Sequence, residues 1–253
     1  MTQRSIQLLL AVAFALTSVT AKAEGFWHDT SVRSRLGYNL GGTSPIGLPA
    51  SIRRLNSFTL QPNPSIGIDA TKPLADHWGI TVGLRIENKG MKIDAKVKNY
   101  HEDIVRGGEE LAGQFTGDVT TKVGQWMITM PIQATWLVSP RVQLRLGPYV
   151  SVLTDKTFTG YAHDGYLRVG DPTGSKVELG GDYSTRGNYD FSDDMRNLQW
   201  GVGAGIDWNV YRHLGVFAEL NWGLNGIHHS HFKTIEQTLY PIFGTFGVTY
   251  RIR

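Results

Sequence analysis

Three histidines lie close together within residues 227–232, at His228, His229 and His231. Imidazole is a common ligand of transition metals. The spacing of these three histidines, however, matches none of the usual zinc patterns. We therefore expect a solvated loop here, with a metal site as the alternative.

A second group of metal-ligand types lies within residues 189–196, where Asp190, Asp193 and Asp194 follow one another closely. Calcium prefers oxygen ligands, but the twelve-residue loop of an EF-hand is absent. We expect this segment, too, to be a solvated loop rather than a cation site.

The adjacent pair His163 and Asp164 supplies a base and an acid. Nucleophilic catalysis also needs a nucleophile that the fold holds against that pair, and no motif here fixes one. We expect no catalytic residues, no cofactor and no metal, so the protein is not an enzyme in this interpretation. An acyl-transfer or proteolytic site on the loops is the alternative.

The glycines Gly201, Gly203 and Gly205 raise the question of a phosphate-binding turn. The dinucleotide fingerprint has the pattern Gly-x-Gly-x-x-Gly, but Ile206 occupies its third glycine position. The surrounding residues alternate instead, with apolar side chains at every even position from 198 to 210. A period of two indicates a strand with one apolar face.

The same alternation recurs along the chain. It covers residues 78–87, 126–138, 142–152, 198–210, 214–224 and 242–252, with weaker segments at 35–41 and 64–71. These segments predict eight strands of about 10 to 13 residues in the stronger cases, and a tilted strand needs about 9–11 to cross a bilayer.

The connections between these strands alternate in length. Residues 72–77, 139–141 and 211–213 are short, whereas about 42–63, 88–125, 155–197 and 225–238 are long and polar. Residues 101–113 have the composition of a brief helix within one of the long loops. Short turns at one end and long loops at the other are typical of an outer-membrane barrel. The fold class we expect is all-β: an eight-stranded antiparallel transmembrane barrel, an up-and-down meander with short periplasmic turns and long extracellular loops.

Six tryptophans stand on the apolar faces near the strand ends. They are Trp126, Trp200 and Trp222 at the long-loop end, and Trp78, Trp136 and Trp208 at the short-turn end. Indole prefers the headgroup level, so two aromatic girdles are expected. A soluble barrel would turn its apolar faces inward instead.

The polar faces carry four basic and four acidic residues. They are Arg35, Arg85, Arg145 and Arg251, with Asp69, Glu87, Asp207 and Glu219. Ionised groups in a narrow interior persist only when paired, and eight strands leave room only for side chains. We expect a packed charge network in the barrel interior, with the three glycines making room for the arginines. A proton or ion path is the alternative.

Residues 1–23 have the features of a Sec-type signal peptide cleaved near Ala23, followed by one outer-membrane β-barrel domain at residues 24–253. Removing Arg4 and Lys22 leaves 23 basic against 22 acidic residues. That balance does not support nucleic-acid binding. There is no cysteine, hence no disulfide and no lipoprotein anchor.

Several strings also resemble a known family. Residues 86–101, 146–153, 164–174, 189–196 and 221–227 resemble the PorT-like outer-membrane β-barrel proteins of Bacteroidetes. The resemblance runs over most of the mature chain. It implies an outer-membrane barrel of a Gram-negative bacterium and a link to type IX secretion, and it brings no catalytic residues. Residues 245–252 resemble the signal read by the barrel assembly machinery, although Ile252 and Arg253 depart from its aromatic end.

The function we expect is a non-enzymatic barrel in the cell outer membrane whose long loops bind envelope or extracellular partners. Expected partners are outer-membrane lipid, lipopolysaccharide, the barrel assembly machinery during insertion and proteins met by the loops. An accessory role in secretion, a loop-borne enzyme and a small channel are the alternatives.

Overall fold

The computed structural model describes residues 29–253 except 48, 233 and 236. The expected signal peptide, residues 1–23, lies outside these described residues. The described residues form no helix, and they therefore contain no helix long and apolar enough to cross a membrane. They form twelve strands: β1 Ser31–Pro45, β2 Ile52–Thr59, β3 Pro64–Pro73, β4 Trp78–Asn88, β5 Met91–Arg106, β6 Glu109–Ser139, β7 Val142–Val169, β8 Lys176–Leu179, β9 Gly187–Asp190, β10 Leu198–Tyr211, β11 Leu214–Gly223 and β12 Leu239–Arg251.

The strands pair antiparallel in a closed circuit. Pairing runs from β1 through β3, β4, β6, β7, β10, β11 and β12 and returns to β1. We call these eight strands the strand circuit. A wider path also exists, because β9 pairs with both β5 and β7, so the sheet is not a simple barrel.

The predicted total of eight strands is wrong, because the structure has twelve. β2, β5, β8 and β9 lie in segments predicted as loops. β6 and β7 also extend far into those segments, with 31 and 28 residues. The suggested helix at 101–113 is instead a hairpin of β5 and β6, closed where Arg106 pairs with Glu109. Local composition could not predict this hairpin, because its backbone groups find their hydrogen-bond partners on the neighbouring strand.

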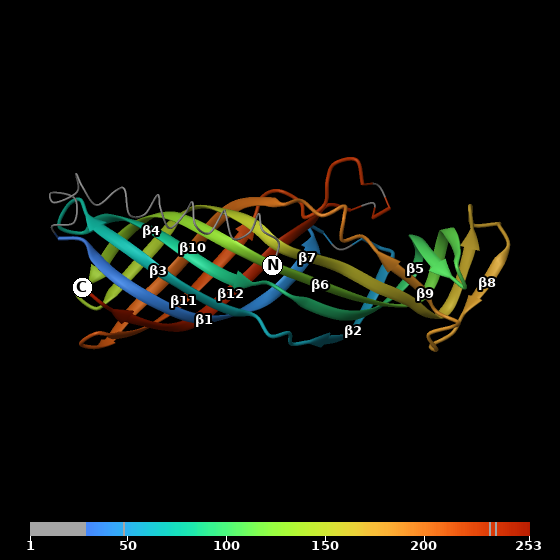
Figure 1. Ribbon diagram of the computed structural model, residues 1–253, viewed down its shortest axis with the longest axis horizontal. Coiled ribbons are helices and arrows are strands. Elements are labelled where there is room, and N and C mark those ends of the chain that lie inside the picture. The colour runs from blue at the N-terminus through green and yellow to red at the C-terminus, as the bar shows by residue number, and fades with distance from the viewer. Residues whose placement is uncertain (1–28, 48, 233, 236) are drawn as a thin grey trace, which may run out of the picture.

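The four additional strands gather at one end of an elongated molecule, opposite the C-terminus (Figure 1). This distal lobe consists of β5, β8 and β9, residues 109–125 of β6 and residues 155–169 of β7; β2 pairs along the edge of β5. β5 continues the direction of β4 along β6, since Asn88 pairs with Trp126 and Met91 with Val123.

The two faces of β6 exchange their character near Trp126. Between Trp126 and Ser139 the buried side chains are mainly polar, such as Gln133, while outward ones such as Ile132 are apolar and 40% exposed. In the distal part the buried side chains are mainly apolar, including Phe115 at 0% exposure.

That apolar interior forms the main buried hydrophobic cluster among the described residues. Its members come from β5, β6, β7 and the segments after β8, and include Val123, Phe158, Leu167, Tyr189 and Met195. The strand circuit therefore encloses polar groups, whereas the distal lobe encloses an ordinary hydrophobic core.

Candidate functional site

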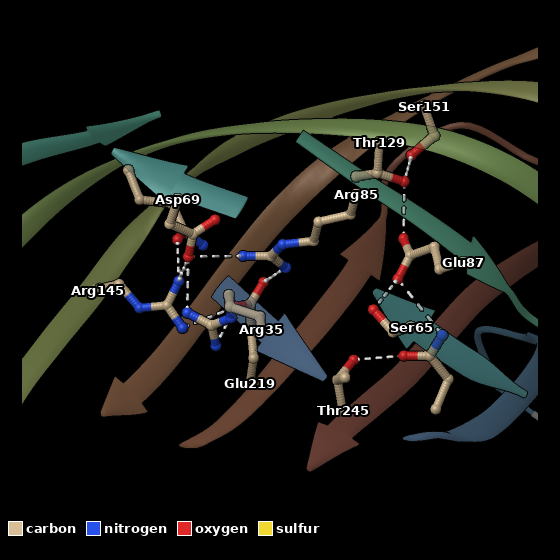
Figure 2. Close-up of polar contacts among 12 residues, drawn as sticks. Arg35, Ser65, Asp69, Arg85, Glu87, Thr129, Arg145, Ser151, Glu219 and Thr245 are labelled. Carbon is tan, nitrogen blue, oxygen red and sulfur yellow. Dashed lines mark hydrogen bonds and ion pairs between the residues drawn. The ribbon is translucent and has the colours of Figure 1, made fainter. Parts of the chain in front are cut away.

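The strand circuit encloses a cluster of ionised side chains. Six of the eight residues predicted for the interior network meet there, one from each of six strands: Arg35, Asp69, Arg85, Arg145, Asp207 and Glu219. Figure 2 labels five of them, all except Asp207, and shows their side chains converging. They provide three guanidinium groups and three carboxylates, all at most 4% exposed, so their formal charges cancel.

Arg145 lies between all three carboxylates. Its Nε is 2.7 Å from Asp207 Oδ2, and its Nη2 is 2.9 Å from Glu219 Oε2. Its Nη1 is 3.4 Å from Asp69 Oδ2 and donates to Gln133 Oε1 at 2.9 Å. Pairing on this scale is what buried charges require, because an isolated one is costly to desolvate.

Arg35 from β1 and Arg85 from β4 complete the cluster. Arg35 Nη1 is 2.7 Å from Asp69 Oδ2, and Arg85 Nη1 is 2.6 Å from Glu219 Oε1. The Arg35 guanidinium also lies over the ring of Phe217, 3.7 Å from its centroid. Cation–π contact of this kind is strongest where water is excluded.

Glu87 belongs to a separate group nearer the distal lobe. Lys89 Nζ is 2.9 Å from Glu87 Oε1, and the Thr129 hydroxyl donates to the same oxygen at 2.7 Å. Thr129 is in turn 2.8 Å from the Ser151 hydroxyl (Figure 2). The structure therefore does not bring Glu87 to an arginine partner.

Arg251 lies apart from the network, at the end of the strand circuit near the C-terminus. It pairs across the strands with Arg33. Both line an open cavity at this end, and no ion pair of Arg251 is found among the described residues. Arg33 donates to Gln143 at 3.3 Å.

Sequence reasoning missed several members of the interior. Lys89 follows the end of β4, outside any alternating segment, so the sequence pattern did not indicate it. The next residue, Gly90, is held by Asn63 through two hydrogen bonds of 2.8 Å. Phe217 was missed because an inward aromatic breaks the polar pattern of β11. Alternation did place Gln133 on the inward polar face, but the predicted network included charged residues only.

The prediction that the glycines of β10 make room for arginine is confirmed at Gly205 alone. A Cβ added at Gly205 would lie 3.1 Å from Arg145 Nη2 and 3.3 Å from Glu219 Cγ. One added at Gly203 would lie 2.7 Å from Asn221 Oδ1. Side chains at these positions would displace the network.

The six tryptophans lie on outward faces of the strand circuit. Their exposed fractions run from 40% for Trp126 to 55% for Trp78. Trp78 and Trp136 pair across β4 and β6 and stack, with ring centroids 5.9 Å apart. Large exposed aromatic rings at both ends of a sheet are typical of interfacial girdles.

The histidine segment is partly packed rather than wholly solvated. His228 lies 4.7 Å from the ring centroids of both Phe158 and Phe232. Burial, with His229 nearby, lowers the pKa of His228 to about 4, so its ring is neutral at pH 7. No group of three His, Cys, Asp or Glu residues within the described ranges could hold a metal ion.

His163 lies between two carboxylates in the distal lobe. Its Nδ1 is 2.8 Å from Asp164 and its Nε2 is 3.2 Å from both Asp94 and the Thr120 hydroxyl. That hydroxyl donates to Asp94 Oδ2 at 2.8 Å. Because its hydrogen is already engaged by Asp94, Thr120 is not arranged to pass it to the imidazole.

A buried carboxyl in the distal lobe was also missed. Glu102 is 3% exposed and lines a cavity of about 90 Å³ whose other walls are mainly apolar. Its Oε2 has no hydrogen-bond partner among the described residues. Burial, and then the neighbouring Asp103 carboxylate, raise the pKa of Glu102 to about 8.

Comparison with known proteins gives one informative match. The family model described as outer membrane protein beta-barrel domain matches residues 21–229. No curated protein matches the sequence.

Among solved structures, similarity is weak. Ail of Yersinia pestis, the attachment invasion locus protein, is 10% identical with a TM-score of 0.37, covering 88% of this chain and 97% of that one. The translocator domain of the autotransporter NalP from Neisseria meningitidis is 11% identical with a TM-score of 0.26, covering 97% and 98%. TM-scores this low support no argument about function.

Proposed function

The chain belongs to the outer membrane protein beta-barrel domain family, and from that premise we propose that its strand circuit is an eight-stranded transmembrane barrel carrying a binding lobe outside the cell. The barrel interior holds structural charge pairs. The distal lobe and the loops beside it meet envelope or extracellular partners, and the protein performs no enzymatic reaction. The narrower PorT-like resemblance, with its link to secretion, remains a prediction.

The observation that carries this proposal is the exchange of faces along β6. A strand whose outward face is apolar up to Trp126 and polar beyond it matches lipid on one side of that residue and water on the other. From Trp126 to Trp136, ten steps of about 3.3 Å tilted by roughly 40° give about 25 Å, the height of the apolar band of such barrels.

The packed interior supports a structural rather than a conducting role. The six-residue cluster joins six of the eight strands of the circuit, and each member forms an ion pair with another member. Separating such pairs to open a path would leave uncompensated charges in the interior, which is strongly destabilising. We therefore expect no steady path for solutes of nutrient size.

The strand β2 supports partner binding. Seven of its eight residues are exposed, including Leu55 and Phe58 at 55% and 41%. It pairs with β5 along one edge, and no described strand pairs with its other edge. Free edges of this kind accept an added strand from a partner.

Membrane placement is tested by spin labels in the protein reconstituted into vesicles. A label at Ile132 or Leu220 should be accessible to oxygen and shielded from a water-soluble nickel reagent. A label at Lys96, on the exposed side of β5, should show the opposite accessibility. Equal access of the nickel reagent to Leu220 and Lys96 would remove the transmembrane assignment.

Partner binding is tested by co-purification from native membranes. The wild-type chain should retain a stoichiometric protein or glycan, and Leu55→Asp with Phe58→Asp should lose it. Glu178→Ser, an exposed change on β8 of the distal lobe, serves as the matched control. Retention of no partner by the wild-type chain contradicts this part of the proposal but leaves the membrane placement intact.

A further inference from the structure

An open groove of about 480 Å³ lies on the distal lobe, outside its hydrophobic core. Lys92 and Lys122 line it from β5 and β6, and Tyr161 lines it from β7. Lys92 stands between core residues Met91 and Ile93, so its side chain points away from that core. Further lining residues come from β9 and the segment before it, including Tyr183, Arg186 and Asp190.

The groove carries a net positive charge, because three basic side chains line it against one carboxylate among the described residues. Lys92 and Lys122 are direct cross-strand partners, and like charges in that position repel each other. Neither ammonium group forms an ion pair among the described residues. The one carboxylate of the groove, Asp190, accepts hydrogen bonds from the backbone and hydroxyl of Ser192.

Two tyrosines flank the third cation. The Arg186 guanidinium lies 4.0 Å from the ring centroid of Tyr161 and 4.9 Å from that of Tyr183. Its Nε donates to Asn188 Oδ1 at 2.8 Å, which fixes the plane of the group. A guanidinium fixed this way presents its two terminal nitrogens to an anion in the fork geometry that suits phosphate.

The lysine end of the groove lies just above the level of the lipid headgroups. Lys122 is four residues beyond Trp126 on the same outward face of β6. Four steps of about 3.3 Å, tilted by roughly 40°, raise it about 10 Å above that indole. The headgroup layer occupies roughly 5–8 Å on each side of the hydrocarbon, so the lysine backbone lies just above this layer and the long lysine side chains can reach down to it.

We propose that this groove binds the phosphorylated sugar headgroup of an outer-leaflet lipid. Lys92, Lys122 and Arg186 contact the phosphate oxygens, and the faces of Tyr161 and Tyr183 border the sugar. This inference rests on the proposed function, because it assumes that Trp126 marks the outer surface of the membrane.

The test uses the full chain in detergent and lipid A as the probe, with retained lipid counted by native mass spectrometry during a titration. Each basic residue near an anionic surface strengthens binding about fivefold. We therefore expect Lys92→Gln with Lys122→Gln to weaken retention by at least about tenfold. Arg186→Gln should weaken it further. A heat-modifiable band on a gel checks that each variant is folded, and Lys122→Gln alone provides a milder change.

Lys96→Gln with Lys98→Gln is the matched control, because these exposed lysines lie on the same strand but farther from Trp126. This variant should retain lipid A as the wild-type chain does. An equal loss in both double variants would overturn the site, since it would indicate unspecific attraction.

Two further probes identify the source of the phosphate. Lipid A without its phosphates should bind at least about tenfold more weakly than intact lipid A, and equal retention would overturn the proposal. Inorganic phosphate at millimolar concentration should not displace lipid A, and full displacement would show an anion site that does not select lipid. Failure of the proposed function is seen separately, as water access to the label at Leu220.

Discussion

At the scale of single residues, the interior of the barrel depends on charges that balance. Arg145 contacts Asp69, Asp207 and Glu219 at once, so its removal leaves three carboxylates with two guanidinium groups. Removing one partner of a buried pair is more damaging than never having the pair, because the remaining charge stays desolvated.

Arg145→Ala should lower the free energy of unfolding by roughly 3–5 kcal/mol. Urea unfolding in detergent micelles, followed by the heat-modifiable band, measures it. Arg145→Ala with Asp207→Ala restores the charge balance and should recover part of the loss. Arg212→Ala, in an exposed turn, should change nothing measurable. A single variant as stable as the wild-type protein would show that the network is not needed for folding.

Glu102 should make the distal lobe sensitive to pH. Its folded pKa of about 8 lies above the ordinary value of 4.5, so the folded state holds the proton more tightly than the unfolded one. The stability it contributes is complete below about pH 4.5 and is lost as pH rises through 8. Each pH unit in that window removes up to about 1.4 kcal/mol.

Hydrogen-exchange protection of β5 and β6 between pH 5 and 9 measures this dependence. Glu102→Gln should flatten the curve and raise protection at pH 8, because the amide never ionises. Glu110→Gln, exposed on the same hairpin, should keep the wild-type slope. Asp103 and the hydroxyl of Tyr189, whose pKa Glu102 also helps to raise, are the other ionisable groups nearby. A wild-type curve without slope contradicts the prediction.

At the scale of elements, alternation predicted the strands of the strand circuit and little of the distal lobe. In β10 large apolar residues alternate with polar or glycine residues, so the period of two is plain. In the distal part of β7 the inward positions are Phe158, Gly160 and Ala162, and small residues weaken the signal. A register shift near Trp126 also moves the inward positions of β7 from odd to even. No local pattern shows such a shift, because it depends on pairing with β6.

The alternation pattern also decided how much of the candidate site could be predicted. Six charged residues on inward strand positions could be expected to meet once the barrel closed. Arg251 also occupies an inward position, but it lies at the end of the strand circuit near the C-terminus. Alternation shows which face a residue is on and does not show which residues of other strands lie at the same level. Lys89 lies between two strands, outside any alternation.

The distal lobe should be weakened separately from the barrel. Phe115 is fully buried in the core of the lobe, and Phe→Ala in a core costs about 3–5 kcal/mol. Phe115→Ala should therefore open the β5–β6 hairpin to protease while the barrel fragment remains protected. Val105→Ala, at a 43% exposed position of the same hairpin, is the control. Loss of the heat-modifiable band would show that lobe and barrel fold as one unit.

At the scale of the whole molecule, the strand circuit and the distal lobe are stabilised by different means. The circuit closes through pairs that lie between the short turns and the level of Trp126. The lobe is held by a hydrophobic core that two long hairpins share, since Val119 and Phe158 pack in the same cluster. The barrel should therefore fold without the lobe. A protein that keeps only one of the two hairpins should be less soluble than a protein that lacks both.

Replacing residues 92–122 and 156–196 each by a short Asn-Gly turn should leave a barrel with a heat-modifiable band. Replacing residues 92–122 alone should cause aggregation, because the apolar faces around Phe158 and Leu167 then lack their covering strands, and large exposed apolar patches associate. Outer-membrane fractionation and light scattering distinguish the two variants. The reverse order, a soluble single replacement and a double replacement that never folds, would mean that the lobe is needed to close the barrel.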